Sequence, residues 1–592
     1  MQSPAEDARL GPALSARPWP WLALLALLAL NGLWAFPLHE PDEGRYAGIA
    51  AAMLRDGDWL STRLNGIDYF EKPPLHFWLV ASCFTLLGRS ELAARLPSAL
   101  SYLAMALLLA AWAGRAFGRA HARSAALVFA TLPLVAFFSH LLIVDLSLAL
   151  WTTCCLYAGY RGLVEPDPEG PPRRGWVLLC WVAAALATLT KGPIGLVLPM
   201  AGLGGYLVFS RAWRRVAALL RPDGPLLYLL VCAPWFVWMS RQHPGYAWAF
   251  FVEENLGRAT TGGGFDRKAP LWFYVPILLG TFAPWALLLP RMAQEVRAPE
   301  TDAAQRLRRL LACAVLVPFA ILSVVGSKLS YYLLPLAPPF ALLAASALHG
   351  LRPPPDALQR WGGRTLVGVG ALLILVALAC IPALVVDTET VRGIFGKGEV
   401  VEAYVREERL RFAAGIAALP ALLLTAVLGG AAAIAAGRAL GRGAPRACCA
   451  RLGGVALSVA LGLPWILTGL GPAISSQRIA RLVSEHAGAT GPVVCYGTFL
   501  RGVPYYLDRP VHLWTATRAE FGHLLPRGAN PYALQEDVAS LQRLTRTKGA
   551  VFIVKNDFAE EVLRQLSPVP LRRVGVVGER VLLVPAPEEE RK

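Results

Sequence analysis

The chain contains thirteen apolar stretches, most of them close to the length that a bilayer requires. A transmembrane helix needs about 20 mainly apolar residues, so a chain that repeats such a run many times folds as a polytopic α-helical membrane protein. Composition agrees, because 55% of the residues are hydrophobic and 16% are charged. These values exclude a soluble enzyme and a disordered chain. The predicted spans are 19–38, 92–113, 123–141, 147–162, 176–190, 192–209, 225–240, 272–290, 310–326, 331–349, 365–386, 411–436 and 452–470.

The loops between these spans carry a charge pattern that predicts their sides. Cytoplasmic loops of membrane proteins are rich in Lys and Arg. Basic loops alternate along this chain, which places the N-terminus in the cytoplasm and residue 39 outside. This pattern explains the net charge of +17 without any nucleic-acid partner. The predicted inner segments are 114–123, the loop with Arg173 and Arg174, 211–215, 291–309, 352–364 and 438–451, and the mixed-charge loop 387–410 is predicted outside.

The first outer loop, 39–91, contains a shorter apolar segment at 75–87. Its 13 residues are too few for a span, and His76 interrupts them. We therefore predict an interfacial or re-entrant helix. Counting this segment as a span would place the basic loop 114–123 outside. The transmembrane domain is accordingly predicted to cover 1–470.

Residues 471–592 differ from the rest of the chain, because charged residues are more frequent there and the apolar runs are only as long as β-strands. Strands are predicted at 492–496, 550–554 and 581–585, with helices at 534–546 and 558–566. This region is expected to form a small soluble α/β domain. Thirteen spans from a cytoplasmic start place it on the outer side of the membrane.

Five outer loops bring charged and tyrosine side chains to one level of the membrane surface. Three of the eight lysines fall in these loops, although the chain otherwise prefers arginine and places its basic residues inside. A compact ammonium group is therefore favoured there. The candidate site residues are Asp42, Glu43, Arg45, Tyr69, Glu71 and Lys72 in the first loop, then Asp145, Lys191, Arg258, Lys328, Tyr331 and Tyr332.

Such a set suits glycosyl transfer from a polyprenyl-phosphate sugar. Cations and a tyrosine at the membrane surface hold a lipid-linked phosphate and stabilise it as it leaves. The carboxylates Asp42 and Asp145 would orient or deprotonate an acceptor, or stabilise an oxocarbenium-like sugar. Such a donor needs no nucleotide, and the chain has neither a P-loop nor a Rossmann glycine pattern. The prenyl tail requires an apolar groove, which we expect near 75–87.

Each of these residues also has a purely structural interpretation. Asp42 and Asp145 could cap helices, the lysines could snorkel to the interface, and the tyrosines could belong to an aromatic belt. For the whole chain, a transporter or lipid flippase is the alternative, but it would place charges at the bilayer midplane and often shows repeated halves. A non-catalytic scaffold is a third. The carboxylates leave room for a divalent metal, but no ligand set has metal spacing.

Segment 42–74, DEGRYAGIAAAMLRDGDWLSTRLNGIDYFEKPP, resembles the first extracytoplasmic loop of the lipid A aminoarabinose transferases. It is similar, more distantly, to that of the protein O-mannosyltransferases, and both belong to the GT-C class of polyprenyl-phosphate-sugar glycosyltransferases. The similarity continues through Asp145, TKGP at 190–193, ENLGR at 254–258 and SKLSYYLLP at 327–335. The resemblance implies thirteen spans, interfacial helices in the first loop and a periplasmic C-terminal α/β domain.

The resemblance also implies roles for individual residues. Asp42 would be the principal catalytic carboxylate and Asp145 the second acidic residue. Lys72 would grip the donor phosphate, helped by Arg258 and Tyr332, and Lys191 would be a further cation. The residues implied to line the same cavity are Glu43, Arg45, Tyr69, Glu71, Lys191, Lys328 and Tyr331.

The implied reaction moves 4-amino-4-deoxy-L-arabinose from undecaprenyl phosphate to a lipid A phosphate at the periplasmic face of a bacterial inner membrane. No cofactor is required, and the partners are the lipid-linked donor, the acceptor and membrane lipids. Two alternatives within the class remain open, namely another sugar transferred to a protein Ser or Thr, or transfer to another envelope glycan. The sequence does not specify an oligomeric state.

Overall fold

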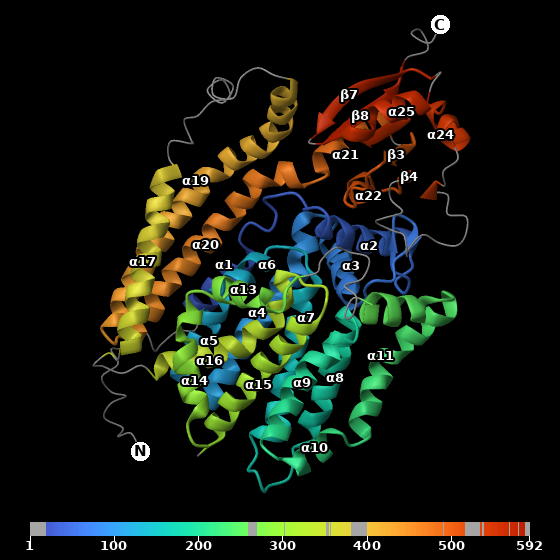
Figure 1. The fold of residues 1–592 in the computed structure, drawn as a ribbon. Helices are drawn as coiled ribbons and strands as arrows, with labels where there is room; N and C mark the ends of the chain where they lie inside the picture. Colours follow the sequence, from blue (N-terminus) through green and yellow to red (C-terminus); the bar gives the residue numbers. More distant parts are fainter. Residues whose placement is uncertain are drawn as a thin grey trace.

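The fold is a helical bundle with a mixed β-sheet region beside one end of it (Figure 1). The computed structural model describes residues 19–586 apart from 258–268, 381–398 and 515–532 and the short stretches 301, 351–354, 356, 489, 535–537, 567–568 and 578. This arrangement confirms the predicted class, a polytopic helical protein with a C-terminal α/β region. The bundle helices are α1 (Trp19–Leu30), α4 (Glu91–Phe117), α5 (Arg119–Ala130), α6 (Pro133–Phe138), α7 (Val144–Gly159), α8 (Arg174–Lys191), α9 (Ile194–Phe209), α10 (Trp213–Leu219), α11 (Asp223–Gln242), α13 (Tyr274–Thr281), α14 (Leu289–Arg297), α15 (Ala303–Val324), α16 (Ala337–His349), α17 (Ala357–Cys380), α19 (Glu399–Gly441) and α20 (Pro445–Ile474).

Apolar length alone qualifies fewer helices as spans than the thirteen predicted. Within the described residues, seven helices are long and apolar enough to cross a membrane, or eight if a bent pair counts as one span. The bent pair is 271–281 with 285–297, whose axes meet at 104°. Other predicted spans form shorter helices, such as α1 and α9. The count of thirteen therefore stays a prediction.

Three predicted boundaries were wrong. Segment 123–141 was predicted as one span, but α5 ends at Ala130 and α6 starts anew at Pro133. Segment 272–290 bends in front of Trp285, directly after Pro284. Proline lacks the N–H that continues a helix, which accounts for both interruptions. The loop predicted at 387–410 is helical from Glu399 onward, where α19 begins and where Glu, Arg and Ala favour a helix, while 387–398 lies outside the described residues.

The first outer loop folds into two helices joined by a hairpin. Helix α2 (Asp42–Asp56) starts at Asp42 and ends before Gly57, whose φ of 68° permits a left-handed cap. Strands β1 (Arg63–Leu64) and β2 (Ile67–Asp68) pair antiparallel across an Asn65–Gly66 turn, where both residues have positive φ. Helix α3 (Leu75–Leu87) has the predicted bounds. The loop thus has its own compact structure between the bundle and the sheet (Figure 1).

The C-terminal region forms a six-stranded sheet with the order β5-β4-β3-β6-β8-β7. The first four strands are parallel, and β8 and β7 add antiparallel at one side. The three predicted strands and two predicted helices are present, while β4, β5, β7 and the two helices α21 and α22 were not predicted. The bounds are α21 (Gln477–Ala487), β3 (Val493–Tyr496), α22 (Val503–Leu507), β4 (His512–Trp514), β5 (Ala533–Leu534), α24 (Val538–Thr545), β6 (Val551–Lys555), α25 (Ala559–Gln565), β7 (Leu571–Val577) and β8 (Arg580–Pro585).

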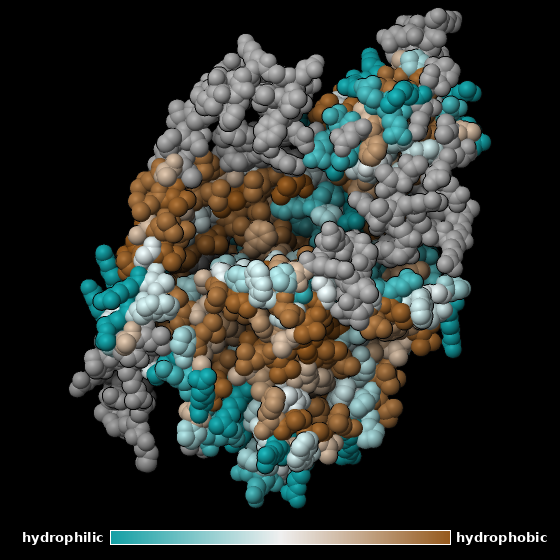
Figure 2. All heavy atoms as spheres, viewed as in Figure 1, coloured by the Kyte–Doolittle hydropathy of each residue, from teal (hydrophilic) through white to brown (hydrophobic). Residues whose placement is uncertain are grey.

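The surface separates by polarity along the molecule. On the face that Figure 2 shows, hydrophobic residues cover much of the helical region, and hydrophilic residues gather at its lower end and on the sheet region. Exposed apolar side chains on these helices include Leu230, Leu316, Val324, Leu375 and Trp465. A soluble protein rarely exposes so much contiguous apolar surface, whereas a bilayer covers it.

One hydrophobic core is shared by the first loop and the C-terminal region. Ile49 of α2 and Phe84 of α3 are buried in the same cluster as Val503 of α22 and Ile553 of β6. The two segments are more than 400 residues apart in the chain. The division predicted at residue 470 therefore follows the chain, but it does not separate two independent cores.

Candidate functional site

A cavity of about 140 Å³ lies where the first loop meets the bundle. Its polar wall combines two lysines with two carboxylates, and its other wall is aliphatic. The lining residues are Lys72, Asp145, Leu148, Lys191, Ile194, Leu198, Glu254, Asn255, Leu322, Val325, Ser327, Tyr332 and Pro335. The aliphatic wall comes from α7, α9, α15 and the segment after α15. None of the lining residues falls in 75–87, where we expected the apolar groove.

Asp145 and Lys191 form a buried ion pair at this cavity. Asp145 lies in the first turn of α7, and Lys191 is the last residue of α8. The Lys191 ammonium donates a hydrogen bond to Asp145 Oδ1. The same ammonium lies 4.3 Å from the centre of the Tyr332 ring and 5.7 Å from that of Tyr331. Residues from three separate elements thus surround one positive charge.

Lys72 makes the second lysine–carboxylate contact of the cavity. Its Nζ donates to the Glu71 carbonyl oxygen over 2.9 Å and lies 3.4 Å from Glu254 Oε1. Glu254 belongs to a π-helical turn, Trp248–Gly257, that was not predicted. Both side chains are largely buried, so their charges interact in a region with little water to screen them.

Asp42 begins a third set of contacts at the start of α2. The Arg45 guanidinium donates to Asp42 Oδ1 and lies 3.6 Å from Glu71 Oε2. Tyr69 donates its hydroxyl to the same Glu71 oxygen over 3.2 Å, and burial raises the pKa of Tyr69. Asp42 remains one-third exposed, whereas Arg45 and Glu71 are mostly covered. Asp42 is therefore the carboxylate of this set that is open to an incoming molecule.

The three sets lie close enough to influence one another. The charges of Lys191, Lys72 and Asp42 all act on the Asp145 carboxyl group. The structure therefore brings Asp145, Lys72 and Lys191 together in the lining of one cavity, and Asp42 lies outside that lining.

Two predicted site residues make contacts elsewhere, and a third is not described. Lys328 donates to the carbonyl oxygens of Val325 over 2.7 Å and Ala269 over 3.0 Å, which stabilises the turn beside the cavity. It does not line the cavity itself, although its neighbour Ser327 does. Glu43 faces a different set of residues, described next. Arg258 lies outside the described residues.

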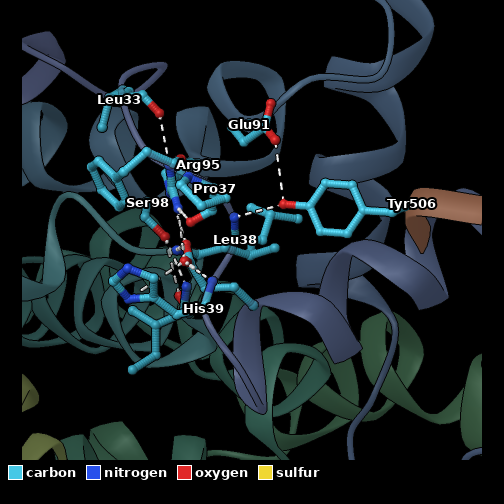
Figure 3. Close-up of polar contacts among 12 residues, drawn as sticks. Leu33, Pro37, Leu38, His39, Glu91, Arg95, Ser98 and Tyr506 are labelled. Atoms are coloured by element: carbon cyan, nitrogen blue, oxygen red, sulfur yellow. Dashed lines mark hydrogen bonds and ion pairs between the residues drawn. The ribbon is translucent and has the colours of Figure 1, made fainter. Parts of the chain in front are cut away.

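Glu43 forms a buried ion pair with Arg95 of α4. Arg95 donates to both Glu43 oxygens over 2.8 Å, and the Leu142 amide donates to Glu43 Oε1 over 2.7 Å. Burial acts to raise the pKa of Glu43, but the charge and hydrogen bonds of Arg95 outweigh it and hold that pKa below its usual range. Arg95 also donates to the carbonyl oxygens of Leu33, Phe36 and Pro37. Figure 3 shows the Arg95 side chain pointing toward this segment, 33–37.

Sequence reasoning missed Arg95, Glu254, Asn255 and Glu40. Glu254 and Asn255 belong to the ENLGR segment, so the signal was present and only its arginine was selected. Arg95 had a detectable signal as well, since it is a lone charge near the start of a predicted span. Within the described residues, no group of three His, Cys, Asp or Glu side chains is placed to hold a metal ion.

Comparisons with known proteins agree with this geometry. The family described as dolichyl-phosphate-mannose-protein mannosyltransferase matches residues 71–238. An undecaprenyl phosphate-alpha-4-amino-4-deoxy-L-arabinose arabinosyl transferase of Pectobacterium carotovorum is 33% identical over 368 residues, or 60% of this chain and 63% of the relative. That of Pseudomonas aeruginosa strain UCBPP-PA14 is 33% identical over 361 residues.

Solved structures extend the likeness to nearly the whole chain. ArnT from Cupriavidus metallidurans bound to undecaprenyl phosphate superimposes with a TM-score of 0.79 at 26% identity, covering 95% of this chain and 97% of that one. The apo form of the same protein gives a TM-score of 0.76. The chain is therefore similar to these transferases in sequence and in fold. The sequence match spans a little under two thirds of the curated relatives' length, whereas the fold matches almost throughout.

The chemistry available at the cavity follows from its walls. Two lysines and a tyrosine line it, and Lys191 lies against the Tyr332 ring, which is a favourable setting for a phosphate. The aliphatic wall next to them suits a hydrocarbon chain.

Proposed function

We propose that this protein transfers 4-amino-4-deoxy-L-arabinose from undecaprenyl phosphate to a phosphate of lipid A at the periplasmic face of the inner membrane. One observation carries the proposal: the cavity pairs Lys72 and Lys191 with an aliphatic wall. It lies in a fold that matches, over 95% of this chain, a protein crystallised with undecaprenyl phosphate. The curated relatives are arabinosyl transferases that use this carrier, according to their names.

In the proposed reaction the donor phosphate binds between the two lysines. Each lysine would exchange its present carboxylate contact for a phosphate oxygen, Lys72 from Glu254 and Lys191 from Asp145. Charge-assisted bonds to the phosphate strengthen as it gains negative charge on leaving, so these contacts favour the transition state. Tyr332, whose ring lies against Lys191, completes this binding set.

The sugar then moves from one phosphate to the other. The bond between sugar C1 and the undecaprenyl phosphate oxygen breaks with its electron pair on that oxygen, and a lipid A phosphate oxygen forms the new bond to C1. The acceptor oxygen is already anionic, so no proton must be removed. Asp42, the more exposed carboxylate, would orient the acceptor or stabilise the developing positive charge on the sugar. No cofactor enters this scheme, because the donor phosphate is itself the leaving group.

The orientation in the membrane is part of the proposal. The bundle end that carries the cavity and the sheet region would face the periplasm, with the N-terminus in the cytoplasm. The alternation of basic loops in the sequence supports this side.

Mass spectrometry of lipid A tests the proposal. The host is a strain that makes the donor but lacks its own transferase, and it expresses wild type, Asp42→Asn or the control Lys548→Met. Lys548 is exposed in the C-terminal region, so its loss leaves the cavity intact. We expect an aminoarabinose-sized mass addition with wild type and Lys548→Met and none with Asp42→Asn. No addition with inserted, folded wild type would overturn lipid A as acceptor, and addition with Asp42→Asn would overturn the role of Asp42.

A further inference from the structure

Glu40 lies two residues before Asp42 and is held by the C-terminal region at three atoms. Its backbone N–H donates to the Ile474 carbonyl oxygen over 2.9 Å. Its two carboxylate oxygens accept hydrogen bonds from the backbone amides of Gly502, over 2.7 Å, and Arg501, over 3.1 Å. Two consecutive amides at the start of α22 thus grip one carboxylate of the first loop.

Gly44 lies two residues after Asp42 and contacts the same turn directly. A Cβ added at Gly44 would lie 2.6 Å from the Gly502 nitrogen and 2.7 Å from its Cα. A Cβ added at Gly502 would lie 2.7 Å from Glu40 Oε1 and 2.4 Å from Ser476 Oγ. Neither position has room for a side chain, so the backbone of α2 rests against the backbone that precedes α22.

Tyr506 adds a third contact on the other side of Glu40. Its hydroxyl accepts a hydrogen bond from the Leu38 amide over 2.8 Å and donates to Glu91 over 3.3 Å. Figure 3 shows the tyrosine reaching from the C-terminal region to this turn. Contacts at positions 38, 40 and 44 therefore bracket Asp42, while Arg95 holds the intervening Glu43 from the bundle side.

This arrangement exceeds what attachment of the C-terminal region requires. Asn65 and Val511 already exchange two hydrogen bonds of 2.7 and 2.8 Å, and Arg89 binds Asp508 and the Tyr505 carbonyl. These contacts, together with the shared core, are enough to join the two segments. Glu40, by contrast, is half-buried, and covering part of a charged group costs free energy unless it is hydrogen-bonded. The hydrogen bonds of Glu40 beside Asp42 are therefore better explained by a role in positioning Asp42 than by a role in attaching the C-terminal region.

We propose that Glu40 and the Arg501–Tyr506 segment position Asp42, so that the C-terminal region sets the geometry of glycosyl transfer. The inference rests on the proposed function, because it takes Asp42 as the carboxylate that acts on the acceptor or the sugar. Glu40 is a positioning residue in this scheme and does not touch the substrate. Lys72 and Lys191, which bind the donor, are held by other contacts.

The experiment compares two variants at this contact with matched controls in the same region. Gly502→Ala introduces a methyl group into the contact with Glu40 and Gly44. Its control is Gly575→Ala in β7, where the added methyl group would have its nearest neighbour 3.4 Å away. Glu40→Ala removes the carboxylate that accepts the two backbone hydrogen bonds. Its control is Glu560→Ala, which removes an exposed carboxylate that forms an ion pair with Arg573. Glu40→Gln is the conservative variant, because its amide oxygen still accepts one of the two N–H groups.

Steady-state kinetics with the lipid-linked donor and hydrogen exchange over residues 42–56 provide two readouts. A displacement of about 1 Å at a reacting group costs up to about 100-fold, so we expect kcat to fall at least about tenfold in Gly502→Ala and Glu40→Ala. The donor KM should change by less than about twofold, since a tenfold change would require the loss of a whole contact. Hydrogen exchange in α2 should rise in both variants, Glu40→Gln should recover part of kcat, and the controls should match wild type.

Two results would overturn the positioning role. One is an unchanged kcat with unchanged exchange in folded Gly502→Ala. The other is a fall in kcat that is fully accounted for by a smaller fraction of protein able to bind donor, because such a fall would reflect unfolding. If wild type itself transfers no sugar, the proposed function fails. The exchange comparison then still decides whether the contact orders α2.

Discussion

Asp145 and Lys191 come from the first turn of α7 and the last residue of α8, and their side chains form one buried ion pair at the cavity. The pair joins the ends of two neighbouring helices, and the same ammonium contacts the Tyr332 ring. A buried pair of this kind has two consequences. Removal of either partner destabilises the fold, and the Lys191 ammonium is a cation to which a phosphate can bind.

The loss of one partner should be costly for folding. Removing one charge of a buried pair leaves the other uncompensated, so Lys191→Met or Asp145→Asn should lower the free energy of unfolding by about 3–5 kcal/mol. The double variant should lose clearly less than the sum of the two single losses. Unfolding in mixed micelles, followed by circular dichroism, measures this cycle. Simple additivity would show that the two side chains do not interact in solution.

Lys72 should be required for donor binding, beyond any effect on folding. One charge-assisted hydrogen bond contributes about 1.5–3 kcal/mol, so Lys72→Met should raise the donor KM of the folded protein by about 10- to 100-fold. Its melting temperature should fall as well, because Glu254 loses a largely buried ion-pair contact. Lys548→Met serves as the control, because Lys548 is exposed and is not among the residues that line the cavity. An unchanged donor KM in folded Lys72→Met would remove Lys72 from the phosphate site.

Much of this site could be predicted because its residues follow simple local rules. Lys72, Asp145 and Lys191 are charges at the ends of apolar runs, and such charges gather on one side of a bundle when the spans alternate. Helix 75–87 was predicted with its observed bounds, since proline precedes it and glycine follows it. The strands at 492–496, 550–554 and 581–585 were visible as short apolar runs.

What sequence reasoning missed depends on long-range contacts. Arg95 pairs with Glu43 from a different helix, and Glu40 meets amides more than 450 residues away. No local pattern records such partners. Glu43 and Asp42 are adjacent, yet one turns toward Arg95 and the other toward Arg45, because successive helical residues point about 100° apart. Lys328 carries the same charge as Lys191, but its turn directs it to carbonyl groups.

Arg45 should be hard to replace even by lysine. Its guanidinium reaches both Asp42 and Glu71 and lies 5.1 Å from the centre of the Tyr46 ring. An ammonium group lacks this planar fork, so Arg45→Lys should leave one carboxylate without its partner and lower kcat by about tenfold. Donor turnover at saturating donor measures the effect. Arg573→Lys, at an exposed pair in the C-terminal region, is the control and should be neutral. Full activity in Arg45→Lys would mean that a single ammonium group supports Asp42 as well as the guanidinium does.

Glu43 should make stability depend on pH in the acidic range. Burial acts to raise its pKa, but Arg95 holds that pKa below the ordinary value, so the folded state binds this proton less readily than the unfolded chain does. The resulting stabilisation is present above the ordinary carboxyl pKa and is lost as the pH falls through the folded-state value. Glu43→Gln should therefore be less stable than wild type near neutral pH, by about 3–5 kcal/mol, because Arg95 stays buried and charged.

The gap between wild type and Glu43→Gln should narrow as the pH falls, since protonation of Glu43 produces the same unpaired Arg95. Melting temperatures in detergent between about pH 7 and pH 3 measure this gap, a range that covers the ordinary carboxyl pKa and the region below it. Glu560→Gln is the control, because Glu560 is mostly exposed and its ion pair contributes little. A gap that stays constant across this range would show that Glu43 does not carry the charge that Arg95 neutralises. If the difference in melting temperature from wild type closes for Glu43→Gln and not for the control, the acid sensitivity of the fold lies at the Glu43–Arg95 ion pair, next to Asp42.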